Sequence, residues 1–163
     1  MEKKIATLAL IVKDQKLLLG IKHRDAEVGA NTLNGPGGKL ESGETLLECV
    51  TRETEEEVGL SITATDEDKR AVIMFHNGKT SLWEVHVYLV TLFEGEPKAT
   101  AAMNPDGEWW YETENLPYST RMLASDGAWM PRVLAGERFF AHVYQNDDAS
   151  KLKDIKFSTM TGS

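Results

Sequence analysis

Apolar runs and alternation of apolar with polar residues along the chain predict the strands of a sheet. Turn-forming residues separate these segments, notably Asp14-Gln15, Asn77-Gly78 and the stretch NDDA (146–149). The first two segments are expected to pair around Asp14-Gln15, and the last two around NDDA. The predicted strands are IATLALIV (5–12), KLLLGIKH (16–23), RAVIMF (70–75), SLWEVHVYLVTLF (81–93), EWWYE (108–112), ERFFAHVYQ (137–145) and KLKDIKFS (151–158).

The segment SGETLLECVTRETEEEVGL (42–60) has the spacing of an amphipathic helix instead. Ser42 is expected to cap the start of this helix, and Gly59 to end it in the left-handed conformation. Its apolar positions recur at intervals of three and four residues, and they are Leu46 or Leu47, Val50, Thr54 and Val58.

A second helix is expected within RMLASDGAWMPRVLAG (121–136), with Pro131 in its first turn and Gly136 at its end. Residues 24–38 have the composition of a loop, because the asparagine, glycine and proline residues of NGPGG disfavour both a helix and a strand ladder. The pattern therefore predicts one α/β domain over residues 1–163, with a mixed sheet and two main helices.

Composition narrows the class of protein. A net charge of −8 without a basic patch argues against nucleic acid as a partner. No apolar run approaches the roughly 20 residues that a membrane span needs, so no membrane partner is expected. Cys49 is the only cysteine, which excludes an intrachain disulfide and favours a reducing compartment. We expect a cytoplasmic protein, and the sequence does not indicate its oligomeric state.

Four glutamates crowd the end of the first predicted helix. At 100° per residue, Glu53, Glu56 and Glu57 share one face, whereas Glu55 points away. Arg52 lies one turn from both Glu56 and Glu48. One interpretation of this cluster is a solvated helix face. The other is a site for Mg²⁺ or Mn²⁺, because converging carboxylates suit hard cations.

The spacing around this cluster resembles the motif of the Nudix hydrolases. Gly38 is followed after five residues by Glu44, after seven more by Arg52, and then by RETEEEVGL. The single departure is Thr54, where the motif has a bulky aliphatic residue. The resemblance implies an α/β/α sandwich around a mixed sheet, the Nudix fold. It also implies metal-dependent hydrolysis, with Mg²⁺ or Mn²⁺, of a nucleoside diphosphate linked to a further group.

The same resemblance implies roles for individual residues. Arg52 matches the arginine that orients Glu53, and Glu44 matches a structural acid. Which glutamate is the general base stays open, with Glu53 favoured. Asp106 and Glu108 are candidates for one further acid, with a simple turn as the alternative. The implied metal-binding residues are Gly37, through its carbonyl, and Glu53, Glu56 and Glu57.

Most of the chain is also similar to the MutT-related oxidised purine nucleoside triphosphatases, in the stretches TLALIVKDQKLLLGIK, NGPGGK, EVHVY and SDGAWMP. The reaction implied is release of pyrophosphate from a purine nucleoside triphosphate, and nucleotide-pool sanitation is the implied role. Two departures concern base recognition, Ser125 in place of an aspartate and Leu123 in place of a stacking tryptophan. Trp109, Trp110, Trp129, Met74 and Phe75 are candidates for replacement walls. The implied substrate-binding residues are Thr7, Lys22, Asn34, Gly38, Lys39, Leu123 and Asp126.

Two alternatives remain open. One is a Nudix hydrolase of ADP-ribose, a dinucleotide polyphosphate or a nucleotide sugar. Phe75 and His76 occupy the place where the ADP-ribose subclass typically has proline, which disfavours that substrate. The other is a nucleotide-binding sensor without turnover, although such proteins usually lose the glutamates that are present here. In each case the expected partner is a small-molecule nucleotide.

Overall fold

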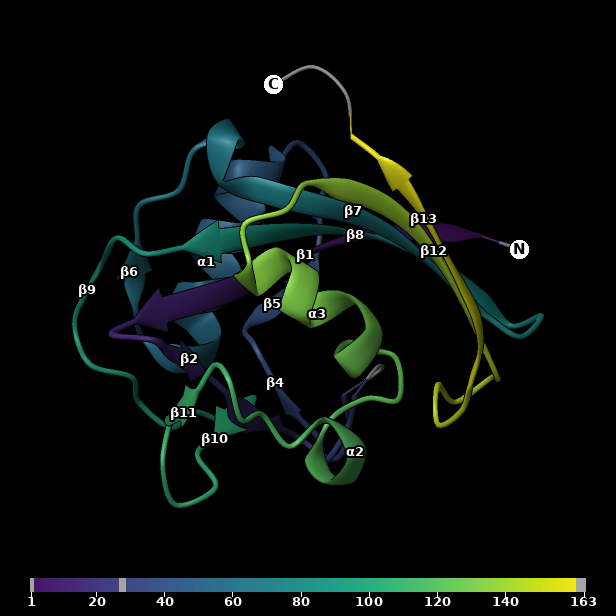
Figure 1. Ribbon diagram of the computed structural model, residues 1–163. Coiled ribbons are helices and arrows are strands. Elements are labelled where there is room, and N and C mark those ends of the chain that lie inside the picture. Colours follow the sequence, from purple (N-terminus) through teal and green to yellow (C-terminus); the bar gives the residue numbers. More distant parts are fainter. Residues whose placement is uncertain (1, 27–28, 161–163) are drawn as a thin grey trace.

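A mixed sheet of eight strands forms the centre of the molecule (Figure 1). The computed structural model describes residues 2–26 and 29–160. The strand order is β11-β2-β1-β8-β7-β12-β13, and β5 also pairs with β1. The pairs β1–β8 and β7–β12 are parallel, and the others are antiparallel. The bounds are β1 Lys3–Lys13, β2 Lys16–Leu18, β5 Gly37–Lys39, β7 Lys69–Asn77, β8 Ser81–Val90, β11 Trp110–Glu112, β12 Phe139–Gln145 and β13 Leu152–Thr159.

Shorter elements surround this sheet. One small sheet has the order β10-β3-β4, and β6 pairs with β9. Their bounds are β3 Gly20–Lys22, β4 Leu33–Asn34, β6 Ser61–Ile62, β9 Phe93–Glu94 and β10 Met103–Asn104. The helices are α1 Leu46–Val58, α2 Tyr118–Arg121 and α3 Asp126–Leu134, together with the 3₁₀ turn η1 Asp66–Asp68.

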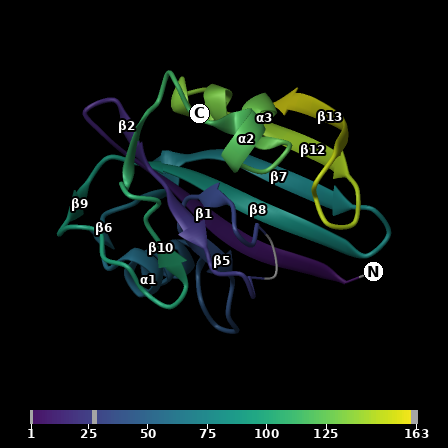
Figure 2. The same ribbon diagram turned by 90° about the horizontal axis from the view of Figure 1, so that it is seen from below.

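The two longer helices cover opposite faces of the sheet (Figure 2). Alternate residues of a strand point to opposite faces, and β1 serves both cores in this way. Leu8 and Leu10 belong to the same core as Trp129 of α3. Ala9 and Ile11 belong to the same core as Val50 of α1. The predicted α/β/α sandwich around a mixed sheet is therefore confirmed.

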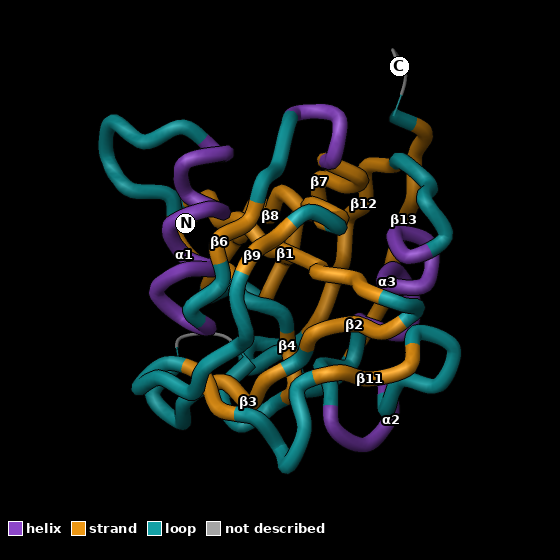
Figure 3. Tube along the Cα trace, turned by 90° about the vertical axis from the view of Figure 1, so that its left-hand side faces the viewer, coloured by secondary structure: helices purple, strands orange, loops and turns teal. Residues whose placement is uncertain are grey.

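The long predicted strands are present, but two of them break. Asp14 and Gln15 both have positive φ, 52° and 62°, as a tight turn of the hairpin type requires. The segment 16–23 divides at Leu19: β2 pairs with β1 and β11, whereas β3 leaves to pair with β4 and β10. The segment 81–93 likewise ends at Val90, and β9 pairs separately with β6 (Figure 3).

The start of α1 differs from the prediction. Thr45 caps it, not Ser42: the Thr45 hydroxyl accepts a hydrogen bond from the Glu48 N–H, and the Glu48 carboxylate accepts one from the Thr45 N–H. Ser42 lies before Gly43, whose φ of 79° turns the chain ahead of the helix. Gly59 ends α1 with φ 73°, as predicted.

The second predicted helix begins earlier than expected and is preceded by another. Pro131 lies in the interior of α3, not in its first turn, because the helix begins at Asp126. Gly136 follows the helix with φ 85°, as predicted. The helix α2 was not predicted, since a single turn is too short to show a periodic pattern. Within the described part of the chain, no helix has the length and apolar character to cross a membrane.

The expectation of a loop throughout 24–38 is wrong at its end. Residues 33–34 form β4, and β5 begins at Gly37 and pairs with β1 through Leu8↔Gly37, Thr7↔Gly38 and Ala6↔Lys39. Residues 27 and 28 of the same segment lie outside the described residues.

Candidate active site

Glycines allow β5 to lie against β1 and α1 at the same time. A Cβ atom at Gly37 would meet the Thr7 carbonyl, and one at Gly38 would lie 2.5 Å from the Glu53 carboxylate carbon. No larger residue fits either position without displacing its neighbours. Glycine locally disfavours a strand. The strand forms here because only glycine allows β5, β1 and α1 to approach so closely.

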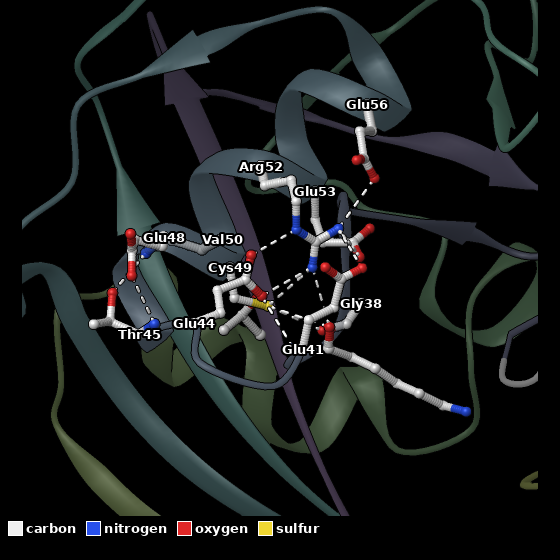
Figure 4. Close-up of polar contacts among 12 residues, drawn as sticks. Gly38, Glu41, Glu44, Thr45, Glu48, Cys49, Val50, Arg52, Glu53 and Glu56 are labelled. Carbon is white, nitrogen blue, oxygen red and sulfur yellow. Dashed lines mark hydrogen bonds and ion pairs between the residues drawn. The ribbon is translucent and has the colours of Figure 1, made fainter.

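Arg52 donates hydrogen bonds to three glutamates, one before α1 and two within it (Figure 4). Its Nε donates to Glu44 Oε2 at 2.6 Å, and its Nη2 donates to Glu44 Oε1 at 3.0 Å. Its Nη1 donates to Glu53 Oε1 at 2.9 Å and to Glu56 Oε2 at 3.1 Å. The Arg52 hydrogen bond lowers the pKa of Glu44 to about 2. Glu48, the other expected neighbour of Arg52, is engaged in the capping box instead.

Glu57 is a half-buried glutamate of α1 that contacts β5. Its Oε1 accepts a hydrogen bond from the Gly37 N–H at 2.7 Å. Burial raises the pKa of Glu57, and the charges of Glu53 and Glu56 raise it further, whereas Lys22 and the Gly37 hydrogen bond lower it. Burial is therefore the main reason that the charged form of Glu57 is disfavoured at this position.

Glu56 is placed differently from Glu53 and Glu57. Its side chain is 60% exposed and is turned toward Arg52, whereas that of Glu53 is 16% exposed. Glu53 and Glu57 line one cavity together with Gly37, and Glu56 does not. We call this the main cavity because it holds most of the predicted site residues. Among the residues that the structure describes, no group of three or more His, Cys, Asp or Glu side chains is arranged to hold a metal ion.

The main cavity, of about 300 Å³, brings most of the remaining predicted residues together. It lies on the α3 side of the sheet and extends past β5 to the carboxylates of α1. Every predicted substrate-binding residue lines it: Thr7, Lys22, Asn34, Gly38, Lys39, Leu123 and Asp126.

Two of the proposed aromatic walls lie in this cavity and others do not. Phe75 and Trp129 line it, and Trp109 and Trp110 pack instead against the core on the α1 side. Met74, also proposed as a wall, is not a lining residue. Sequence reasoning missed Trp83, Asn77 and Gln145, which also line the cavity. Trp83 and Gln145 lie on predicted strands, where the facing of alternate positions could have found them. Asn77 was assigned to the turn Asn77-Gly78, but it ends β7 instead.

Asp126 is the most deeply buried acid in the cavity wall, with 2% of its surface exposed. Its Oδ2 accepts a hydrogen bond from the Leu123 N–H at 3.1 Å. Burial raises the pKa of Asp126 to about 7, although that hydrogen bond acts in the opposite direction. Asp126 is therefore poised between its neutral and charged forms near neutral pH.

Four further polar lining residues make contacts of their own. Asn34 Oδ1 accepts from the Gly35 N–H at 2.9 Å, and Lys22 Nζ donates to the Gly37 carbonyl at 3.4 Å. The Thr7 hydroxyl contacts the buried Cys49 thiol at 3.3 Å. Lys39 Nζ lies 5.6 Å from the centre of the Trp83 ring. The cavity thus has two cations, Lys22, whose charge acts on Glu57, and Lys39 beside Trp83.

Asp106 and Glu108 form a turn around Gly107, whose φ is 81°. Asp106 makes an ion pair with Arg121. Neither acid lines the main cavity. The structure therefore supports the reading of this stretch as a turn.

Comparison with known proteins places the chain in a family. A family model described as a NUDIX domain matches residues 2–135. The oxidized purine nucleoside triphosphate hydrolase of Danio rerio is 35% identical over 139 residues, 85% of this chain and 85% of that protein. The protein of the same name from Mus musculus is 31% identical over 146 residues, 89% of each chain.

Similarity to solved structures concerns the fold. The crystal structure of a MutT protein from Bacillus halodurans has a TM-score of 0.76 at 21% identity, covering 94% of this chain and 97% of that one. The NUDIX match spans the segment from Gly38 to Leu60 in which the family motif was recognised. The chain therefore belongs to the Nudix family and is a Nudix hydrolase.

Proposed function

We propose that the protein hydrolyses a purine nucleoside triphosphate to the nucleoside monophosphate and pyrophosphate, and that residues 1–163 form one domain for this purpose. The observation that carries the proposal is the shared cavity. Asn34 and Asp126 line it together with Glu53 and Glu57. The amide and carboxyl groups suit the edge of a base, and the glutamates suit a metal-assisted reaction on a phosphate chain.

The relatives support the same substrate class. The Danio rerio and Mus musculus proteins are named as hydrolases of oxidised purine nucleoside triphosphates. This chain has Leu123 where the resemblance leads us to expect a stacking tryptophan, and the buried Ser125 where it has an aspartate. The proposal therefore specifies a purine, and it does not specify an oxidised base.

The donor set at α1 fits a divalent cation. Glu53, Glu57 and the Gly37 carbonyl offer hard oxygen atoms, which Mg²⁺ and Mn²⁺ prefer. The raised pKa of Glu57 reflects burial and negative charge that a cation would offset. Glu56 would join this set only after its side chain rotates away from Arg52. When bound, such a cation would neutralise phosphate charge and make a water molecule more acidic.

The protein's own residues divide the remaining tasks. Arg52 holds Glu53 in a fixed orientation through the 2.9 Å hydrogen bond, and it is itself held by the two hydrogen bonds that it donates to Glu44. Lys22 and Lys39 line the cavity and place positive charge where the triphosphate would lie. Glu53 is the proposed base that removes a proton from the attacking water.

A panel of nucleotides tests this proposal. Wild-type protein with Mg²⁺ would be given dGTP, 8-oxo-dGTP, dATP, dCTP, dTTP and ADP-ribose, and pyrophosphate and phosphate would be measured separately. We expect equal amounts of monophosphate and pyrophosphate, with kcat/KM for purines at least about tenfold above that for pyrimidines. EDTA should abolish turnover.

Three results would contradict the proposal: release of phosphate alone, preference for ADP-ribose, or binding without turnover, which would indicate a sensor. The ratio of kcat/KM for 8-oxo-dGTP to that for dGTP decides whether the oxidised base is preferred.

A further inference from the structure

A pair of amide side chains lines the same cavity as the motif residues Glu53 and Glu57. Asn77 ends β7 and Gln145 ends β12, and they are register partners in this parallel pair. Gln145 Nε2 donates to Asn77 Oδ1 at 2.7 Å. Both side chains line the cavity, and the two residues are 3% and 4% exposed.

This pair leaves hydrogen-bonding groups unused. Gln145 Oε1 is buried and has no partner among the described residues. Asn77 Oδ1 is occupied by Gln145, and this bond fixes the plane of the Asn77 amide and hence the direction of its Nδ2 donor. Around the pair the wall is apolar, from Phe75, Val85 and Trp129. A buried amide without partners is unfavourable in such surroundings, so a ligand that supplies them is favoured.

The strands do not need this side-chain bond to stay together. The Gly78 N–H donates to the Gln145 carbonyl at 2.8 Å, and β7 and β12 are in register from Phe139↔Ala71 to Gln145↔Asn77. The backbone ladder therefore already joins the ends of the two strands. A structural role alone does not explain why amides, rather than apolar side chains, occupy these positions.

We propose that Asn77 and Gln145 form a second base-recognition site, separate from Asp126, that offers one donor and one acceptor to the edge of the bound base. This inference rests on the proposed function, since it requires the base to lie in this cavity. The ligand class is a purine with a neighbouring donor and acceptor, as in the lactam of guanine or the amino group and ring nitrogen of adenine. Gln145 positions Asn77 and also accepts from the ligand.

Metal-free binding of nucleoside monophosphates tests the inference without depending on turnover. The affinities of dGMP, dAMP and unsubstituted purine deoxyriboside monophosphate would be measured by calorimetry. The variant is Asn77→Leu/Gln145→Leu, which removes both amides at once and leaves neither one unpaired, so that the fold is retained. Gln145→Met, which keeps the length of the side chain, is the second variant should the first not fold. The control is Tyr144→Leu, because the Tyr144 ring stacks on His76 on the opposite face of the sheet.

We expect the variants to bind dGMP and dAMP at least about tenfold more weakly, because a site built to hydrogen-bond its ligand discriminates strongly. Binding of the unsubstituted purine, which can accept from Asn77 but has no donor for Gln145, should weaken by a smaller factor. The Tyr144→Leu control should bind all three ligands as the wild type does.

Unchanged dGMP affinity in the variants would overturn the inference, as would equal weakening for all three ligands. Absence of dGMP binding by the wild type would also overturn it. Failure of the proposed function is seen separately, as absence of pyrophosphate release from purine triphosphates by the wild type.

Discussion

Asp126 makes the stability of the protein depend on pH in a direction opposite to that of most carboxylates. Its pKa is raised by burial from 3.8 to about 7. Between these values the folded state holds a proton that the unfolded state has lost, so the free energy of unfolding falls as pH rises through this window. The contribution is fully present below about pH 4 and is lost above about pH 7, and it amounts to about 4 kcal/mol at most.

We therefore expect Asp126→Asn to gain stability relative to the wild type as pH rises. At pH 4 the two proteins should have similar free energies of unfolding, and at pH 8 the variant should be the more stable by about 1–4 kcal/mol. Urea unfolding at both pH values measures the difference, and the contributions of other titrating groups cancel. If the difference in free energy of unfolding is the same at pH 4 and pH 8, burial does not raise the pKa of Asp126.

The directions of individual side chains could be predicted from the sequence only in part. Helical spacing placed Glu53, Glu56 and Glu57 on one face because it fixes the direction of each Cα–Cβ bond. It does not fix the rotamer, and in the structure the Glu56 carboxylate accepts from Arg52 and does not line the cavity. Gln145 and Asn77 carried no motif. Their importance follows from the pairing of two strands far apart in the sequence.

At the scale of elements, the capping box at the start of α1 positions the helix that carries the glutamates. Thr45→Ala removes the hydroxyl that accepts from the Glu48 N–H. We expect it to lower the free energy of unfolding by about 1 kcal/mol, as is usual for the loss of a threonine cap. Ser42→Ala is the matched control, since Ser42 lies outside the helix, and it should change stability by less than about 0.5 kcal/mol. Chemical denaturation compares them, and equal effects of the two substitutions would argue against the cap.

Elements with a periodic pattern were predicted well, and those defined by tertiary contact were not. The strands β1, β7, β8, β12 and β13 follow from their apolar alternation or runs. The strand β5 opposes the local preference of its glycines, because only residues without Cβ allow it to approach Thr7 and Glu53. The break at Leu19 also depends on which strands are near, and the sequence of that segment does not indicate it.

In the molecule as a whole, the sheet brings the two halves of the cavity together. The edge of β1 pairs with β5 along Ala6–Leu8 and with β2 along Val12–Lys13, so the β1 edge is shared between two partners. On one face lies α1 with its glutamates, and on the other lies α3 with Asp126 (Figure 2). Glu53 and Glu57 of α1 nevertheless line the same cavity as Asp126 and Trp129 of α3. The architecture itself was predictable from the motif, whereas the composition of the cavity depends on side chains from separate elements.

The central claim is that the carboxylates of α1 that line the cavity carry out the hydrolysis. The measurement that tests it most directly is kcat for pyrophosphate release from dGTP with saturating Mg²⁺, in Glu57→Gln and in Glu55→Gln. Glu55 is the matched control, because it is an exposed glutamate of the same helix outside the main cavity. We predict that Glu57→Gln lowers kcat at least about 100-fold with the fold intact, and that Glu55→Gln stays within about twofold of the wild type. Near-normal turnover by a folded Glu57→Gln protein, or an equal loss in both variants, would contradict the account.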